Sequence, residues 1–373
     1  APAASSSSET GEACSNSGTS ANYEESLSVN GTLTERSVST STGCPNHISI
    51  QINPNTASEN PVSEEIPAYP MMFADGGTTD LSEAAMSIGI MRNGVALFSA
   101  YGGKTAVVDY ETTAFYVESD TFDLCGGHAT TDGSYHYHST PGCLQEHAME
   151  VDGTTAEEHS PILGWSFDGF PVYGQLGPGG VEMLMCGADG ADATYCVDTC
   201  SGYEGELPGT DDFKYRYYTT CGFDEAFFPF VVNCFRGCCP DGMTCNRHVE
   251  ACGDSPEEGY TADYVPEVTV SLDDFYETDL IDGDDTDFLF NMDAILDCSL
   301  YLGIEATSTI DGTASEATPA PSAASTDALA PGSTASPAAA SVTPAPSSDT
   351  TDTGENNTSG ASSLFGFSGV FSL

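Results

Sequence analysis

Histidine is concentrated in one short part of the chain, and its spacing there suits metal binding. Five of the seven histidines lie between His128 and His159, and two of them alternate with tyrosine in the run Tyr135-His136-Tyr137-His138. Successive side chains of a β-strand point to opposite faces, so His136 and His138 would share one face and the two tyrosines the other. Imidazoles about 7 Å apart on one face can converge on a single ion. The run therefore predicts a site for Zn or Cu.

Two imidazoles do not complete a metal site, and the neighbouring sequence offers further ligands. A third nitrogen would come from His128, His147 or His159. Asp123 and Asp168 could fix the tautomer of a ligating ring by accepting its second N–H. The alternative is a structural strand whose imidazoles hydrogen-bond the backbone of the cysteine-rich loops, without an ion. The sequence leaves both interpretations open.

The segment that carries the histidines is repeated further along the chain. Asp123-Leu-Cys125-Gly-Gly127-His128 precedes the Tyr/His run, and Asp198-Thr-Cys200-Ser-Gly202-Tyr203 precedes a similar aromatic run, Tyr215-Arg216-Tyr217-Tyr218. A repeated D-x-C-x-G followed by aromatic residues at every second position indicates a duplicated strand unit. The second copy has tyrosine, arginine and tyrosine where the first has His128, His136 and His138. Because the scaffold is kept and the imidazoles are not, we expect the histidines to serve more than packing.

These motifs, with others in the same order, resemble the YHYH domain family. The further blocks include Asn93-Gly-Val95, Pro141-Gly-Cys143-Leu144, Phe167-Asp168-Gly-Phe-Pro171-Val-Tyr173-Gly174 and Asn233-Cys234-Phe-Arg236-Gly237. The resemblance runs over roughly residues 70 to 240. It implies a secreted protein and names no reaction. Family members often carry a Y-H-Y-H-like run in the second copy as well, but here that copy reads Y-R-Y-Y, so a site built from imidazoles of both copies is not expected.

Cysteine usage predicts the compartment. The chain has 14 cysteines, an even number, most of them between Cys125 and Cys252. So many thiols do not suit a reducing cytosol, and the pattern is typical of an extracellular disulfide framework. The predicted pairs are Cys14 with Cys44, which would tie the N-terminal segment to the body, and, from the duplication, Cys125 with Cys143 and Cys200 with Cys221. The crowded cysteines from Cys221 onward favour a small disulfide knot over a zinc knuckle.

The chain is strongly acidic, which excludes one class of partner. It has 57 Asp and Glu against 7 Lys and Arg, a formal net charge of −50, and so lacks the basic surface that nucleic-acid binding needs. Such a surface could bind calcium, and oxygen ligands crowd around Gly283, from Asp279, Asp282, Asp284, Asp285 and Asp287. Their spacing departs from an EF-hand loop, so a solvated acidic loop is the favoured alternative there. No apolar stretch approaches the roughly 18 residues of a membrane span.

The order of segments predicts one folded domain between flanking arms. The expected segments are a Ser/Thr/Glu-rich arm at 1–43, a β-rich and Cys-rich domain at 44–255, an acidic segment with a short docking helix at 256–305, an Ala/Ser/Thr/Pro-rich stalk at 306–363 and an apolar tail at 364–373. The tail resembles a GPI signal but lacks its polar spacer. Glycosylation sequons at Asn30, Asn356 and Asn357 fit exposure outside the cell.

Runs rich in Val, Ile, Phe and Tyr predict that the domain is all-β or β-rich and stabilised by disulfides. Strands are expected in both Tyr-rich runs and at residues 47–53, 86–98, 105–117 and 227–233. Two functions fit this fold. One is a secreted or cell-surface metal-binding protein with a histidine cluster, with the question of catalysis left open. The other is a structural cell-wall or adhesion module that contacts a wall polymer, in which the His/Tyr strand is core packing and the acidic surface binds calcium.

Overall fold

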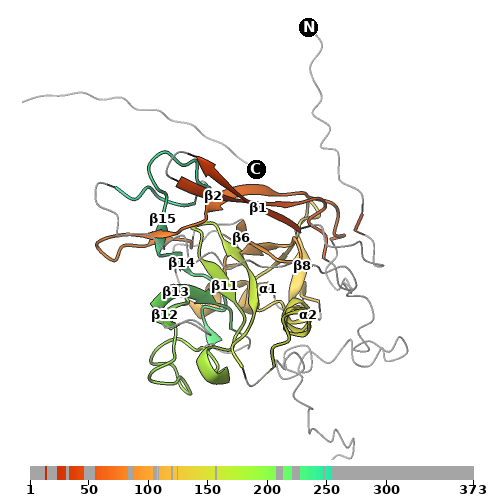
Figure 1. Cartoon of the computed structure of the whole chain (residues 1–373). Coiled ribbons are helices and arrows are strands. Elements are labelled where there is room, and N and C mark those ends of the chain that lie inside the picture. Colours follow the sequence, from red (N-terminus) through yellow and green to blue (C-terminus); the bar gives the residue numbers. More distant parts are fainter. Residues whose placement is uncertain are drawn as a thin grey trace, which may run out of the picture. The chain divides into compact units, whose positions relative to one another are not determined.

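The computed structural model describes most of the chain between residues 13 and 253 (Figure 1). The described ranges are 13–14, 23–30, 33–45, 55–82, 87–103, 107, 109–118, 121–123, 125–155, 158–206, 213–220, 227–246 and 248–253. The predicted strand at 47–53, the Asp-rich loop around Gly283, the docking helix, the stalk, the apolar tail and the sequons at Asn356 and Asn357 lie outside these ranges. Those predictions stay predictions.

An eight-stranded sheet is the centre of the fold and confirms the predicted β-rich class. Its strands, in chain order, are β6 (Ser87–Met91), β7 (Ala96–Phe98), β8 (Gly127–Ala129), β9 (Tyr135–Tyr137), β10 (Ile162–Ser166), β11 (Pro171–Tyr173), β12 (Gly202–Glu206) and β13 (Phe213–Tyr218). Their spatial order is β12-β13-β11-β10-β6-β7-β9-β8. One half of the sheet is made of β6 to β9 and the other of β10 to β13. In the first half the antiparallel hairpins β6–β7 and β8–β9 are joined by the parallel pair β7–β9, and in the second half β10–β11 and β12–β13 are joined by the parallel pair β11–β13. The two predicted Tyr-rich strands are β9 and β13, one in each half.

Two glycines allow the halves to meet at the antiparallel contact between β6 and β10. Gly89 pairs with Ser166, and Gly164 pairs with Met91. A Cβ atom at Gly89 would lie 2.6 Å from the carbonyl oxygen of Trp165, and one at Gly164 would lie 2.4 Å from the carbonyl oxygen of Ile90. Only glycine lets these backbones approach so closely. The remaining residues of the two strands are almost entirely buried, as expected for central strands.

A second sheet occupies part of the segment that the composition assigned to a loosely ordered arm. It consists of β1 (Tyr23–Asn30), β2 (Leu33–Thr40) and β3 (Ser63–Pro67) in that order, all antiparallel. Residues 23–30 and 33–40 within that segment are therefore strands. Arg36 on β2 attaches this sheet to β10 of the large sheet. Its guanidinium is fully buried, lies 3.6 Å from the centre of the Trp165 ring and pairs with Glu25. The predicted Cys14–Cys44 disulfide also forms.

Three predicted strands differ from the structure. The described part of 86–98, which begins at residue 87, is a hairpin rather than one strand, with its turn at Asn93 and at Gly94, where φ is +82°. The described part of 105–117 holds a 3-10 helix, η1 (Tyr110–Thr112), and the helix α1 (Ala114–Glu118). The Thr113 hydroxyl accepts a hydrogen bond from the Tyr116 amide, and this local cap outweighs the β-propensity of the segment. Residues 227–233 form turns and loop rather than a strand.

Short elements complete the described fold. They are β4 (Met71–Met72), β5 (Thr79–Asp80), β14 (Cys234–Phe235), β15 (Gly237–Cys238), the 3-10 helix η3 (Pro178–Gly180) and the helix α2 (Gly142–Asp152). β14 pairs with β5, and β15 pairs with β4. The helices in the described ranges are too short or too polar to cross a lipid bilayer.

Disulfides connect these elements, and most of the predicted ones form. The described pairs are Cys14–Cys44, Cys125–Cys143, Cys186–Cys196, Cys200–Cys234, Cys238–Cys252 and Cys239–Cys245. The last two confirm a disulfide knot in place of a zinc knuckle. The predicted partner of Cys200 is wrong, because Cys200 reaches β14 instead of closing its own hairpin. So many disulfides fit an extracellular protein.

Candidate metal centre

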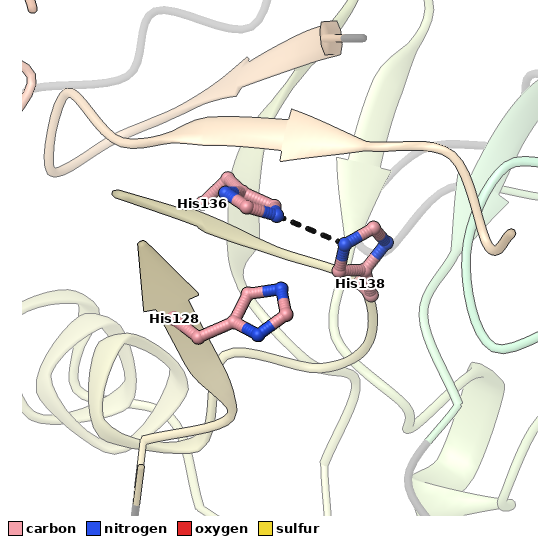
Figure 2. Close-up of side chains that lie close together, drawn as sticks. All are labelled: His128, His136 and His138. Carbon is pink, nitrogen blue, oxygen red and sulfur yellow. Dashed lines mark hydrogen bonds between the residues drawn. The ribbon is translucent and has the colours of Figure 1, made fainter. Parts of the chain in front are cut away.

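Three of the five clustered histidines meet at one edge of the large sheet. His128 on β8 lies directly opposite His136 on β9, and His138 follows β9. One ring nitrogen from each can be chosen so that all three lie within 4.8 Å of one another. Figure 2 shows the three rings turned toward a common space. The predicted alternation is confirmed, since the hydroxyls of Tyr135 and Tyr137 bond instead to Asp123 and Asn93.

Hydrogen bonds at Nδ1 define the tautomer of each ring. His136 Nδ1 lies 3.0 Å from the Ser134 carbonyl oxygen, and His138 Nδ1 lies 2.6 Å from the Ser99 carbonyl oxygen. A carbonyl oxygen can only accept, so both Nδ1 atoms carry the proton and donate it. His128 Nδ1 lies 2.6 Å from the Thr121 hydroxyl, which donates its own proton to the Glu118 carbonyl oxygen. His128 therefore also donates from Nδ1, and in the neutral rings all three Nε2 atoms hold lone pairs.

The three Nε2 atoms face one another without a proton to share. His136 Nε2 and His138 Nε2 are 2.9 Å apart, the contact drawn as a dashed line in Figure 2. In the described structure His128 Nε2 is buried without a hydrogen-bond partner, and the carboxylate atom Glu118 Oε2 lies 3.5 Å from it. Lone pairs this close repel unless a cation lies between them. The arrangement of donors and lone pairs is the one that metal-ligating histidines adopt.

Burial makes a proton a poor candidate for that cation. Desolvation lowers the pKa of His128 to about 4 and that of His138 to about 3. The pKa of His136 is also well below its ordinary value, mainly because of desolvation and then because of the neighbouring His138 and His128. The rings are thus neutral around pH 7 and available as metal ligands. In a tetrahedral site with bonds of 2.0 to 2.1 Å, nitrogens lie about 3.3 Å apart, so an ion would need ring shifts on the order of 1 Å.

Aromatic side chains hold the rings, and a pocket opens beside them. The Phe98 ring stacks on His136 with centroids 3.9 Å apart, and the Phe122 ring lies 4.5 Å from that of His128. The adjoining pocket has a volume of about 410 Å³ and is lined by all three histidines together with Glu118, Thr121, Phe98, Tyr101, Gly102 and polar residues of the β8–β9 turn. An ion held by the histidines would therefore face a space large enough for a small ligand.

Glu118 is the residue of this site that the sequence did not reveal. It ends α1 and presents the only carboxylate among the pocket-lining residues. Burial raises the pKa of its carboxyl. A Cβ atom at Gly102 would lie 2.6 Å from Glu118 Oε1, so the absence of a side chain there lets the carboxylate fold back toward the histidines. The residues before it, 105–117, were expected to form a strand, whereas Glu118 ends a helix and its carbonyl oxygen accepts a hydrogen bond from the Thr121 hydroxyl.

The other predicted ligands lie elsewhere. His147 is buried in α2 and is not part of the clustered group. His159 Nε2 lies 2.6 Å from the Tyr218 hydroxyl, in the other half of the sheet. His147 and His159 therefore lie outside the cluster of the other three histidines.

Neither predicted carboxylate orients a ring of the cluster. Asp123 accepts hydrogen bonds from the Tyr135 hydroxyl and from the amides of Cys125 and Gly127, which shapes the loop before β8. Asp168 accepts from the Tyr217 hydroxyl, the Ser166 hydroxyl and the Gly237 amide. The tautomers are set instead by the two carbonyl oxygens and the Thr121 hydroxyl described above. This part of the prediction is wrong because a buried carboxylate satisfies itself with the nearest donors, here tyrosine hydroxyls and amides.

Asp168 makes the stability of the fold depend on pH. Burial raises the pKa of its carboxyl to about 6, against the hydrogen bonds from Ser166, Tyr217 and Gly237 that lower it. The folded state then binds the proton more tightly than the unfolded state, so the free energy of unfolding falls as pH rises from about 4 to about 6, by an amount on the order of 3 kcal/mol. Asp168→Asn removes this slope. Urea titrations at several pH values check it, and parallel pH profiles for the two proteins would contradict it.

These features define a β-rich, disulfide-stabilised domain with a histidine triad that could hold a metal ion. Residues 63–195 match the family model described as YHYH protein, which confirms the resemblance over that part of the chain. The match spans the triad, α2, β10 and β11, and ends before the β12–β13 hairpin that the sequence resemblance had included. No curated protein and no solved structure gives a significant match to the chain.

Proposed function

We propose that the protein is an extracellular metal-binding protein whose ion, Zn or Cu, is held by His128, His136 and His138. The observation that carries the proposal is the convergence of three Nε2 lone pairs whose rings are fixed by hydrogen bonds at Nδ1. Nitrogen donors without sulfur suit either metal. The tyrosines of β9 face away from the cluster, which disfavours chemistry that needs a phenol bound to copper.

Three protein ligands leave a coordination position for water or a small ligand. Structural zinc sites use four protein ligands, whereas catalytic sites keep one position open. Here the open side faces the pocket, and Glu118 stands next to it. A bound ion would supply Lewis acidity and lower the pKa of coordinated water. The geometry thus favours a reactive or ligand-exchanging centre over a purely structural one, and the pocket's own residues would orient what binds there.

Elemental analysis tests the proposal. Protein secreted by a eukaryotic host, purified without chelators and then dialysed against trace Zn or Cu, should retain close to one ion per chain. After addition of excess EDTA the melting temperature should fall, because an ion that binds only the folded state stabilises it. Metal content below about a tenth per chain under both loading conditions would exclude a three-nitrogen site of ordinary affinity. The structural wall module, the alternative function, would then remain.

Glu118 provides a test of the open side of the site. Glu118→Gln keeps the size of the side chain and removes its charge, so we expect close to one Zn per chain to remain but the affinity for Zn to fall about tenfold, as for loss of a supporting group. Competition with a chromophoric chelator measures this change. Glu111→Gln, at an exposed position of η1, is the matched control and should have no effect. Equal affinities for the two variants would show that Glu118 does not act on the ion.

A further inference from the structure

The internal repeat extends well beyond the two hairpins. Ser87–Ser99 aligns with 162–174 at an offset of 75 positions, which matches Gly89 to Gly164 and Gly94 to Gly169, and the same offset matches Asp123 to Asp198. Hydrogen bonds repeat as well. In the first repeat Asn93 bonds the Tyr137 hydroxyl, and in the second the equivalent Asp168 bonds the Tyr217 hydroxyl.

The sheet itself shows that the repeats are related by an approximate two-fold rotation. From one end of the sheet to its centre the order is β12-β13-β11-β10, and from the other end it is β8-β9-β7-β6. The two orders are the same when β6, β7, β8 and β9 are matched to β10, β11, β12 and β13. At the centre Gly89 pairs with Ser166, and the equivalent pair, Met91 with Gly164, also forms. Each histidine of the cluster therefore has a structural counterpart in the second repeat. The counterparts of His128, His136 and His138 are Tyr203, Arg216 and Tyr218, and that of Phe98 is Tyr173.

The guanidinium of Arg216 lies among those same counterparts. In the first repeat the His136 ring lies 3.9 Å from Phe98, 4.6 Å from His128 and 4.7 Å from His138, between ring centroids. In the second repeat the carbon at the centre of the guanidinium lies 5.9 Å from the Tyr173 ring, 5.2 Å from Tyr203 and 5.5 Å from Tyr218. Faces of tyrosine attract a cation at such distances. The longer arginine side chain thus brings a positive charge to the place where the first repeat gathers its lone pairs.

This cation is fully buried and well bonded. Arg216 has no exposed surface, its Nε donates to the Tyr218 hydroxyl at 2.7 Å, and one terminal nitrogen donates to the Gly205 carbonyl oxygen at 3.0 Å. His159 was one of the expected metal ligands, but it forms its hydrogen bonds in the second repeat instead. Its Nδ1 donates to the Ser160 carbonyl oxygen, so its Nε2 accepts the proton of the Tyr218 hydroxyl. Arginine keeps its charge in such surroundings, which lysine or histidine would not.

We propose that Arg216 is a built-in cation that fills, in the second repeat, the place that the metal ion fills in the first. This inference rests on the proposed function. The domain then has one exchangeable cation, open to the pocket, and one permanent cation, sealed by His159 and three tyrosines. Removal of metal should loosen the β8–β9 hairpin and leave β12–β13 unchanged.

Hydrogen exchange of the wild-type protein tests the asymmetry without any substitution. Addition of EDTA to the Zn-loaded protein should speed amide exchange across β8 and β9 by about tenfold or more, while exchange across β12 and β13 stays within about twofold. Equal responses of the two hairpins, or a response of β12–β13 alone, would overturn the inference. A wild-type protein that never binds Zn would instead remove the proposed function, on which the inference rests.

Substitution of the second repeat should convert the permanent cation into an exchangeable one. The variant Tyr203→His/Arg216→His/Tyr218→His should bind one more Zn per chain than the wild type, and EDTA should now loosen β12–β13. Arg216→Met, the matched control, removes the charge at similar length and should lower the melting temperature without gaining Zn. A triple variant that keeps the wild-type near-ultraviolet circular dichroism and gains no Zn would overturn the inference. If that variant does not fold, the exchange experiment on the wild type decides.

Discussion

The variant His136→Ala/His138→Ala should bind less than a tenth of an equivalent of Zn or Cu and still fold. Both imidazoles supply lone pairs at the shared space, and their Nε2 atoms are only 2.9 Å apart. Loss of two of three ligands should weaken metal binding by more than about 100-fold, beyond the effect of losing a supporting group. The tyrosines of β9 still pack on the opposite face, because Tyr137 is fully buried and keeps its bond to Asn93.

A control histidine separates ligation from packing in this experiment. His147→Ala removes a buried imidazole from α2, outside the cluster, and should leave the metal content unchanged. Elemental analysis gives the metal content, and thermal unfolding with and without EDTA gives the stability. In the double variant the melting temperature should no longer respond to EDTA. Full metal content in the double variant, or equal loss in both variants, would contradict the assignment of the ligands.

The variant Gly164→Ala should lose about 3 kcal/mol of unfolding free energy, as expected for forcing an atom into a packed core. Its new Cβ would lie 2.4 Å from the Ile90 carbonyl oxygen and 2.7 Å from the Met91 Cα, and neither backbone atom can move without disturbing the contact between the two repeats. Gly89→Ala should behave similarly, because the repeat places it against the Trp165 carbonyl oxygen.

A glycine with free space around it provides the comparison. At Gly153 a Cβ would meet no atom within 4 Å, although φ is +68°, so Gly153→Ala should cost only the strain of the left-handed backbone, about 1 kcal/mol. Urea unfolding measured by near-ultraviolet circular dichroism compares the variants. A Gly164→Ala protein no less stable than Gly153→Ala would show that the central strands do not approach as closely as described.

Much of the metal centre was predictable from the repeat. The three positions at which the second copy lacks imidazoles, Tyr203, Arg216 and Tyr218, are the counterparts of the three histidines that converge. The alternation of the Tyr/His run fixed the face of His136 and His138. Choosing His128 over His147 and His159 required the pairing of β8 with β9, which depends on the length and conformation of the turn between them. A turn with a different register would turn His128 to the other face.

Other features could not be predicted because they depend on contacts between distant residues. Strands β1 and β2 carry mostly polar side chains, and their stability depends on a buried Arg36 that packs on Trp165, more than 100 positions away. Cys200 pairs with Cys234 because β14 passes close to its hairpin, which the local spacing of cysteines does not encode. Glu118 enters the site because it ends the helix α1, in which the Tyr116 amide bonds the Thr113 hydroxyl, although the preceding sequence is strand-like.

Anomalous diffraction at the edge of the bound metal would test the central claim most directly. Crystals of the Zn- or Cu-loaded protein should show one anomalous peak in the sheet domain, at 2.0 to 2.1 Å from the Nε2 atoms of His128, His136 and His138, with each Nδ1 still bonded to its oxygen acceptor. A loaded protein whose peak lies away from these nitrogens, or whose three rings stay at their present positions with no peak between them, would contradict the account.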